Sequence, residues 1–257
     1  MIKAAFFDID NTLYDWKHKQ WVQSGLDAVK SLKEKGIKVF LASARPLHSQ
    51  IQFGAFNLGI KWDGYISSAG AIAFTKGRYV KKDLMDKKDV YKIIALANKL
   101  GLTMEVVTPK SRYLSAPANQ YLTSYHGTYT DITPPVRHYN GGPCTGVLLF
   151  SPEEFDGEFR QALPNLLYYR FHPSAVDVTP CEHLKGDAIA AILRYYGIND
   201  DEAISFGDDF QDISMKDHSL FVAMGNGKDE VKDNADYVTD PIWEDGVRNA
   251  LIHLEAL

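Results

Sequence analysis

The sequence has little of several features that define specialised classes of protein. It contains only two cysteines, Cys144 and Cys181. Two are too few for a disulfide framework and neither has a metal-ligand spacing, so we expect both to be small buried residues in a reducing compartment. The apolar run at residues 4–7 stops at Asp8, far short of a secretory signal or a membrane span. These features predict a cytoplasmic protein with no membrane contact.

An excess of positive charge is also absent. Lys and Arg total 28 against 33 Asp and Glu, a formal net charge of −5. Because a nucleic-acid surface needs a field that attracts the phosphate backbone, this balance argues against nucleic-acid binding and leaves small phosphorylated metabolites open. What is present, 257 residues at 45% apolar and 24% charged, suffices for one large core or two smaller ones.

Both ends of the chain alternate buried strands with amphipathic helices. Uninterrupted apolar runs at 2–8 and 37–43 are typical of central parallel strands, and apolar residues at helical spacing follow each run. The last third of the chain repeats this rhythm. We therefore expect an α/β fold, a Rossmann-like doubly wound parallel sheet formed by residues 1–79 and 179–257. The helices expected in it cover 22–36, 46–59, 186–196, a segment that starts at Asp212 and a closing segment up to Leu257.

The middle of the chain has a different character. Residues 71–80 are typical of a hairpin that turns at Lys76-Gly77, and a helix carrying Val90 and Ala97 precedes several short strands. Residues 80–178 are therefore expected to form an inserted α+β domain. The tryptophans, Trp16 among them, are expected to serve packing.

Two acids follow the first predicted strand. Asp8 and Asp10 are two residues apart, so both side chains point to the same side of the strand end, where open α/β sheets bind ligands. Two like charges there need a counter-ion, and carboxylates suit a hard divalent cation such as Mg²⁺. Taken alone, the pair fits equally well a helix-capping Asp beside a solvated one.

Polar groups also end the next strand and begin a late helix. The Ser43 hydroxyl and the Ala44 N–H precede Arg45 and Pro46, which open a helix whose positive end favours an anion. An ordinary helix cap has the same pattern. Lys185 begins a helix, where its charge opposes the macrodipole, and a nearby anion would remove that conflict. A flexible surface lysine is the alternative.

A second group of acids follows a later strand. Asp208, Asp209 and Asp212 place three carboxylates within five residues. Beside Asp8 and Asp10 these groups would repel one another strongly, and a bound metal would relieve the repulsion.

Taken as a set, these motifs resemble the haloacid dehalogenase superfamily. DIDNTL is similar to its first signature through Asp8, Asp10 and Thr12; LAS is similar to the second through Ser43; and LKGDAI supplies Lys185. GDDFQD resembles the acidic fourth motif. Residues 222–227 and 235–247 are similar to the Cof-like branch of the superfamily. In that branch a cap of type C2B is inserted between the second and third motifs. Within the branch, the chain especially resembles bacterial hexose-phosphate phosphatases.

The resemblance implies a Mg²⁺-dependent phosphatase acting on a small phosphorylated metabolite. Asp8 would be the nucleophile that forms an aspartyl-phosphate, and Asp10 the general acid and then the base. Mg²⁺ would be held by Asp8, Asp208 and the backbone carbonyl of Asp10. The phosphate would be bound by Ser43, Ala44, Lys185 and Gln211. Supporting positions would be Thr12, Arg45, Asp209 and Asp212, the last orienting Lys185 or a metal-bound water.

Three positions depart from the family pattern. Asn11 replaces a glycine, Ala69 replaces an asparagine, and Gln211 replaces the asparagine that touches the phosphate or its waters. Asn tolerates unusual backbone angles, so we expect Asn11 to do little harm. These changes motivate one alternative, a sugar-phosphate-binding module without turnover.

Two further alternatives share the same groups. A signalling receiver that stores phosphate on an aspartate also combines acids, a hydroxyl and a lysine, but it lacks a large insert before the lysine. A phosphomutase would differ only in the acceptor of the phosphoryl group. We expect a monomer or weak homodimer.

Overall fold

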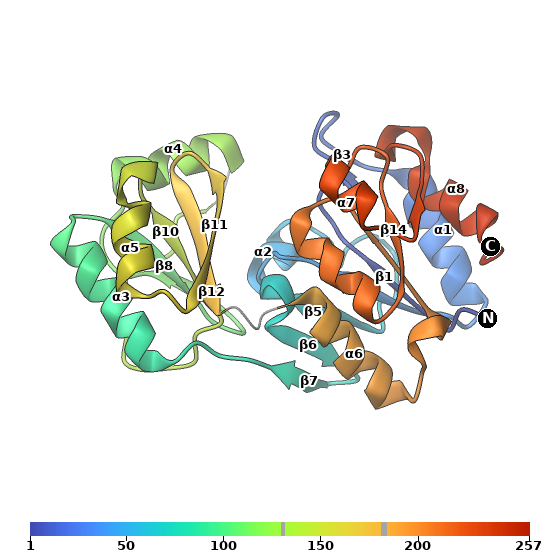
Figure 1. Cartoon of the computed structure of the whole chain (residues 1–257), viewed down its shortest axis with the longest axis horizontal. Coiled ribbons are helices and arrows are strands. Elements are labelled where there is room, and N and C mark those ends of the chain that lie inside the picture. The colour runs from blue at the N-terminus through green and yellow to red at the C-terminus, as the bar shows by residue number, and fades with distance from the viewer. Residues whose placement is uncertain (130–131, 181–183) are drawn as a thin grey trace. The chain divides into compact units, whose positions relative to one another are not determined.

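The computed structural model describes residues 1–129, 132–180 and 184–257, and it divides the chain into two compact units (Figure 1). The first unit combines Met1–Lys82 with Leu184–Leu257, and the second is Asp83–His183. The insert expected at 80–178 thus begins three residues and ends five residues later in the structure.

Strand pairing explains both shifts. The strand Arg78–Lys82, β7, hydrogen-bonds to its hairpin partner Ile72–Thr75, β6, in the sheet of the first unit. The strand Ala175–Pro180, β12, lies instead inside the sheet of the second unit. A strand stays with the sheet that satisfies its backbone groups, so each boundary falls after the strand.

The first unit is built on an eight-stranded sheet. Its other strands are β1 (Ala4–Phe7), β4 (Lys38–Ala42), β5 (Gly64–Ser67), β13 (Ala203–Gly207), β14 (Leu220–Ala223) and β15 (Tyr237–Val238). The order is β15-β14-β13-β1-β4-β5-β6-β7, parallel from β15 to β5 and antiparallel at β6 and β7. The predicted α/β sheet is therefore confirmed, with an antiparallel edge added by the predicted hairpin. A separate two-stranded ribbon joins β2 (Tyr14–Asp15) to β3 (Gln20–Trp21).

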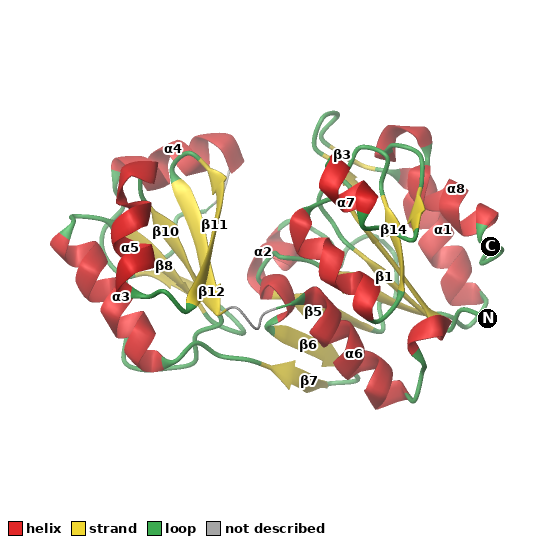
Figure 2. Ribbon diagram, viewed as in Figure 1, coloured by secondary structure: helices red, strands yellow, loops and turns green. Residues whose placement is uncertain are grey.

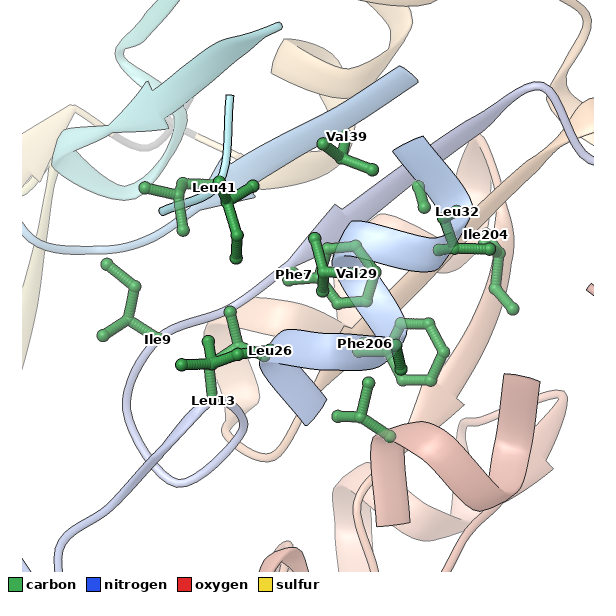
Figure 3. Packing of buried hydrophobic residues seen from close by; sticks show 14 of the residues in the cluster. Phe7, Ile9, Leu13, Leu26, Val29, Leu32, Val39, Leu41, Ile204 and Phe206 are labelled. Atoms are coloured by element: carbon green, nitrogen blue, oxygen red, sulfur yellow. The ribbon is translucent and has the colours of Figure 1, made fainter. Parts of the chain in front are cut away.

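Helices cover both faces of this sheet (Figure 2). They are α1 (Gln23–Glu34), α2 (Leu47–Gln52), α6 (Lys185–Tyr196), α7 (Asp229–Asp233) and α8 (Gly246–His253), with 3-10 turns η1 (Ser68–Gly70), η3 (Asp200–Glu202), η4 (Phe210–Asp217) and η5 (Ile242–Glu244). Alternate residues of β1 serve the two cores: Phe7 packs with α1 and α8 (Figure 3), and Phe6 packs with α6 and α7. The strand is thus buried on both faces, as its unbroken apolar sequence predicts.

Two helix predictions needed correction. The helix expected up to Gly59 ends at Gln52, because Gly54 takes a φ of +80° and reverses the chain. Ile51, near the end of this short helix, is 55% exposed. The helix expected from Asp212 begins earlier, at Phe210, since Asp209 caps it. The hairpin turn at Lys76-Gly77 is confirmed by left-handed φ values of 45° and 78°.

The second unit is an antiparallel sheet with helices on each face. Its elements are α3 (Lys87–Lys99), β8 (Thr103–Val107), β9 (Arg112–Leu114), α4 (Gln120–Tyr129), β10 (Gly146–Phe150), η2 (Glu153–Phe155), α5 (Asp156–Ala162), β11 (Leu166–His172) and β12. The strand order is β11-β12-β10-β8-β9. Val147 and Leu149 of β10 pack with α3 and α5, whereas Phe150 packs with α4. This is the α+β composition expected of the insert.

Two expectations about single features can be compared with the structure. Cys144 is buried in the apolar cluster of the second unit, and Cys181 lies outside the described residues. Across residues 1–129, 132–180 and 184–257, no helix has the length and apolarity needed to cross a bilayer.

Candidate active site

The strand order changes direction at β1. From β1 the chain continues to β4 on one side and reaches β13 on the other. Ligands of open α/β sheets bind outside the carboxyl ends of the strands where the order reverses in this way. Asp8, Ser43 and Asp208 directly follow β1, β4 and β13, and all three are buried. The topology thus brings together polar residues that are far apart in the sequence.

Lys185 joins this edge from the first residue of α6. Its Nζ donates to Asp8 Oδ1 at 2.7 Å and to Asp212 Oδ1 at 2.6 Å, and the residue is only 2% exposed. Burial opposes the charge of Lys185, but the two carboxylates outweigh it and raise the pKa of the ammonium above its usual value. They also supply the negative charge that the start of α6 favours, which answers the conflict seen in the sequence.

The carboxylates around Lys185 repel one another. One oxygen from each of Asp8, Asp208 and Asp212 lies within 4.8 Å of the others. Burial raises the pKa of Asp8 to about 8, against the opposing effect of Lys185. Burial, followed by repulsion from Asp8 and Asp212, raises the pKa of Asp208 well above its usual value. One lysine therefore does not balance this cluster.

The donor set fits a hard divalent cation. Both carboxylate oxygens of Asp212 already accept hydrogen bonds. Oδ1 accepts from Lys185, and Oδ2 accepts from the backbone N–H groups of Asp208 at 2.9 Å and Asp209 at 3.0 Å. Asp8 and Asp208 have no comparable set of backbone donors among the described residues and lie close together, so these two side chains are the ones suited to a metal. Buried, mutually repelling carboxylate oxygens are the ligands that Mg²⁺ prefers.

The loop after β1 is fixed from two directions. Asn11 takes a φ of +54°, which its side chain tolerates as predicted, and that side chain hydrogen-bonds to Asp208. Asn226 Nδ2 donates to the Asn11 carbonyl at 3.0 Å, while Asn226 Oδ1 accepts from the Ile242 amide at 2.7 Å. Asn226 lies in the VAMGNG segment that resembled the family, but its neighbour in space was not predictable from that motif.

Asp10 directs its carboxylate to a different group of residues. Arg45 donates from Nε to Asp10 Oδ2 at 2.8 Å and from Nη2 to Oδ1 at 2.7 Å. Trp16 Nε1 donates to Oδ1 at 2.7 Å. Trp16 packs against Tyr14 and Phe53, as expected, and its indole N–H has the additional role of binding Asp10. No spacing signalled the contact, because the β2–β3 ribbon decides where the indole points.

The remaining predicted residues take distinct positions. The Ser43 hydroxyl accepts the Arg45 amide at 3.2 Å, and Ala44 lies between them. Thr12 is buried next to the β1 loop. Asp209 caps η4 and pairs with Lys228 at 2.5 Å, with 39% of its side chain exposed, so it lies outside the Lys185 cluster.

Two buried polar atoms near these loops have no hydrogen-bond partner among the described residues. They are Thr12 Oγ1 and Gln211 Oε1. Gln211 precedes Asp212 on η4, and its side chain is half-buried. A buried acceptor without a donor costs free energy, which a ligand or a water that donates to it would recover.

Comparison with known proteins places the chain in a family. The model of the haloacid dehalogenase-like hydrolases matches residues 5–251. YkrA of Bacillus subtilis (strain 168) is 25% identical over 99% of this chain and 98% of its own length. YwpJ of the same strain, named a phosphatase, is 24% identical over 98% of this chain and 100% of its own length.

Solved structures agree with this assignment. A hypothetical protein from Geobacillus kaustophilus HTA426 superposes over 100% of both chains with a TM-score of 0.92 at 27% identity. The sugar phosphatase BT4131, of subclass IIB, superposes over 99% of this chain and 100% of its own with a TM-score of 0.84 at 31% identity. The chain therefore belongs to the haloacid dehalogenase-like hydrolases, and the family and Cof-like branch predicted from its motifs are confirmed.

Proposed function

We propose that the protein is a Mg²⁺-dependent phosphatase that hydrolyses small phosphomonoesters, sugar phosphates among them, through an aspartyl-phosphate on Asp8. The observation that carries this proposal is the buried Asp8 carboxylate, held by Lys185 at one oxygen and facing Asp208 at the switch point of the sheet. The names of BT4131 and YwpJ, a sugar phosphatase and a phosphatase, support the same class of reaction.

In the first step, one carboxylate oxygen of Asp8 attacks phosphorus. The salt bridge from Lys185 holds the Asp8 side chain in place for that attack. The bond from phosphorus to the leaving oxygen breaks, and Asp10 gives that oxygen a proton. In the second step, a water molecule attacks the phosphorus of the aspartyl-phosphate. Asp10 takes a proton from that water, and inorganic phosphate leaves with Asp8 restored.

The charge of the phosphoryl group is balanced by several groups at the same edge. Lys185, the Ser43 hydroxyl and the Ala44 N–H would bind its oxygens. Gln211 Oε1, which accepts from no described residue, would accept from a water or a hydroxyl beside them. Mg²⁺, held by Asp8, Asp208 and the Asp10 carbonyl, would neutralise charge so that an anionic nucleophile can approach a dianion.

Metal removal tests the first part of the proposal. We expect the purified protein to hydrolyse p-nitrophenyl phosphate with added Mg²⁺, to lose that activity in EDTA, and to regain it when Mg²⁺ is returned in excess. Ca²⁺ at the same concentration is the matched control, since it is larger and less strict in geometry. Equal rates in EDTA and in Mg²⁺ would rule out this mechanism.

Trapping tests the covalent intermediate. Acid quenching during turnover of a ³²P-labelled sugar phosphate should leave label on the peptide that contains Asp8. Label without release of phosphate would instead identify a phospho-aspartate signalling module, and binding without label would identify a sugar-phosphate-binding module. Transfer of the label to a second sugar would identify a mutase.

The physiological ester is best sought by kinetics. A panel of hexose, pentose and triose phosphates, pyridoxal phosphate and nucleotides, compared by kcat/KM, would reveal a preferred substrate as a peak over several decades. The cytoplasmic location and the monomeric or weakly dimeric state stay predictions.

A further inference from the structure

Among residues 1–129, 132–180 and 184–257, the N–H groups that reach the Asp10 carboxylate come from two side chains. Oδ1 accepts from the Trp16 indole and from Arg45 Nη2, both at 2.7 Å, and Oδ2 accepts from Arg45 Nε at 2.8 Å. A carboxylate offers about four lone pairs, so three are occupied by described residues and one remains, on Oδ2. The Asp10 side chain is 32% exposed, so this last lone pair can be reached from outside the protein.

The two donors are themselves held in place. The Arg45 guanidinium lies over the Phe53 ring, 4.1 Å from its centroid, and donates from Nη1 to Ser49 Oγ at 3.1 Å. The Trp16 ring stacks on the same Phe53 at 5.6 Å and an interplanar angle of 24°. Tyr14 packs edge-on against both rings. Cation–π and ring contacts of this kind restrict long side chains that would otherwise sample many rotamers.

We propose that Arg45 and Trp16 are positioning residues that orient Asp10, so that Oδ2 is the atom that exchanges the proton with the leaving oxygen and then with water. This inference rests on the proposed function, because it takes Asp10 as the acid and base. The planar guanidinium of Arg45 sets the plane of the Asp10 carboxylate. The indole N–H of Trp16 occupies the second lone pair of Oδ1, so the lone pair that stays open is on Oδ2.

A fixed direction matters because proton transfer depends on distance and alignment. A misplacement of about 1 Å costs about 10²-fold in rate in well-oriented reactions. The effect should appear only where the leaving oxygen needs a proton. Phenyl phosphate and p-nitrophenyl phosphate have almost the same size, but phenolate is the poorer leaving group and depends more on the acid.

The test compares kcat/KM for these two substrates with Mg²⁺ present. Asp10→Asn should lower the value for phenyl phosphate about 10²-fold more than the value for p-nitrophenyl phosphate. Arg45→Lys, which keeps the charge and loses the fork, should show the same selectivity at about tenfold, and Arg45→Met should exceed it. Trp16→Phe, which keeps the ring and loses the N–H, should show about threefold. Glucose 6-phosphate, with an alkoxide leaving group, should follow phenyl phosphate.

Matched substitutions elsewhere in the first unit serve as controls. Trp62→Phe removes an indole that donates to the Ala55 carbonyl, and Arg194→Lys changes an exposed side chain on α6. Both should leave the ratio of the two substrates unchanged. Suppose that Asp10→Asn is selective for phenyl phosphate. The positioning role would then be overturned if the Arg45 and Trp16 variants lost kcat/KM equally on both substrates, or if they changed KM alone. A non-selective Asp10→Asn would overturn the assignment of Asp10 itself.

Discussion

The two units differ in how their buried and half-buried acids are grouped. In the first unit, Asp8, Asp208 and Asp212 come from distant segments and share one lysine. In the second, Glu105 and Asp177 lie on one face of the sheet, each opposite Leu148 of the strand between them. Glu105 pairs with Arg112 of the adjacent strand at 3.3 Å, and Asp177 receives only the Val178 amide among the described residues.

The acid cluster of the first unit has the electrostatics of a cation site, whereas the acids of the second unit do not. Carboxylates that are crowded together raise one another's pKa, and a cation brought from outside relieves all of them at once. Removal from water raises the pKa of Asp177 to about 7, against the opposing hydrogen bond from the Val178 amide. Repulsion from another acid plays no part in this shift. Strong coupling among buried acids is therefore a feature of the proposed reaction centre, and the isolated acid of the second unit lacks it.

The largest expected effect comes from the nucleophile. Asp8→Asn should lower kcat by roughly 10⁴-fold or more, since removal of a covalent nucleophile abolishes the first step. Binding of a phosphate ester, measured by calorimetry, should be largely retained. Asp177→Asn, the corresponding change in the second unit, should leave kcat within about twofold, because Asp177 belongs to the sheet of that unit and not to the Lys185 cluster. Hydrolysis by the Asp8 variant at the parent rate would reverse the comparison.

Lys185 should matter for both activity and stability. Lys185→Met leaves two buried carboxylates without their shared partner, which we expect to cost about 3–5 kcal/mol in urea unfolding as well as nearly all turnover. Lys228→Met, which removes the exposed partner of Asp209, should cost no more than about 1 kcal/mol. Added Mg²⁺ should recover part of the stability of the Lys185 variant. Equal losses for the two lysines would show that the cluster is not electrostatically special.

A smaller effect should follow from a single methyl group behind Asp212. A Cβ on Gly207 would lie 2.4 Å from Asp212 Cγ, so Gly207→Ala must displace the side chain that orients Lys185. We expect a loss of about 1–3 kcal/mol and a fall in kcat. Gly157→Ala on α5 of the second unit meets nothing within 4 Å and should be neutral or stabilising by up to about 1 kcal/mol. Thermal unfolding and steady-state rates of the two variants decide the point.

The smallest expected effect concerns pH and the second unit. The pKa of Asp177 rises from its ordinary value of 3.8 to about 7 in the folded chain. At a pH between these two values, the unfolded chain has released the Asp177 proton and the folded chain still holds it. The contribution of Asp177 to stability therefore falls as the pH rises through this window. Asp177→Asn cannot ionise, so its Tm minus that of the parent should increase from pH 5 to pH 8. Asp201→Asn, at an exposed position, should show a constant difference.

The sequence was most informative where a residue's role depends on its own strand. Asp8, Ser43 and Asp208 follow apolar runs, and parallel strands end at a common edge, so their meeting could be predicted. Lys185 was recognisable from its unfavourable place at a helix start. The family resemblance predicted that Asp212 would orient Lys185, and the two side chains do form a hydrogen bond. The outward position of Asp209, which caps η4 and pairs with Lys228, could not be predicted.

Linear patterns specified which strands are buried on both faces, where the hairpin turns, and that acids and a lysine gather at one edge of a parallel sheet. Tertiary structure alone decided that Trp16 and Arg45 hold Asp10, that Asn226 holds the loop of Asn11, and that Asp177 has no cationic partner among the described residues. The physical reason is that hydrophobic periodicity and strand polarity are local properties, whereas a hydrogen bond between side chains depends on the folded path of every segment between them.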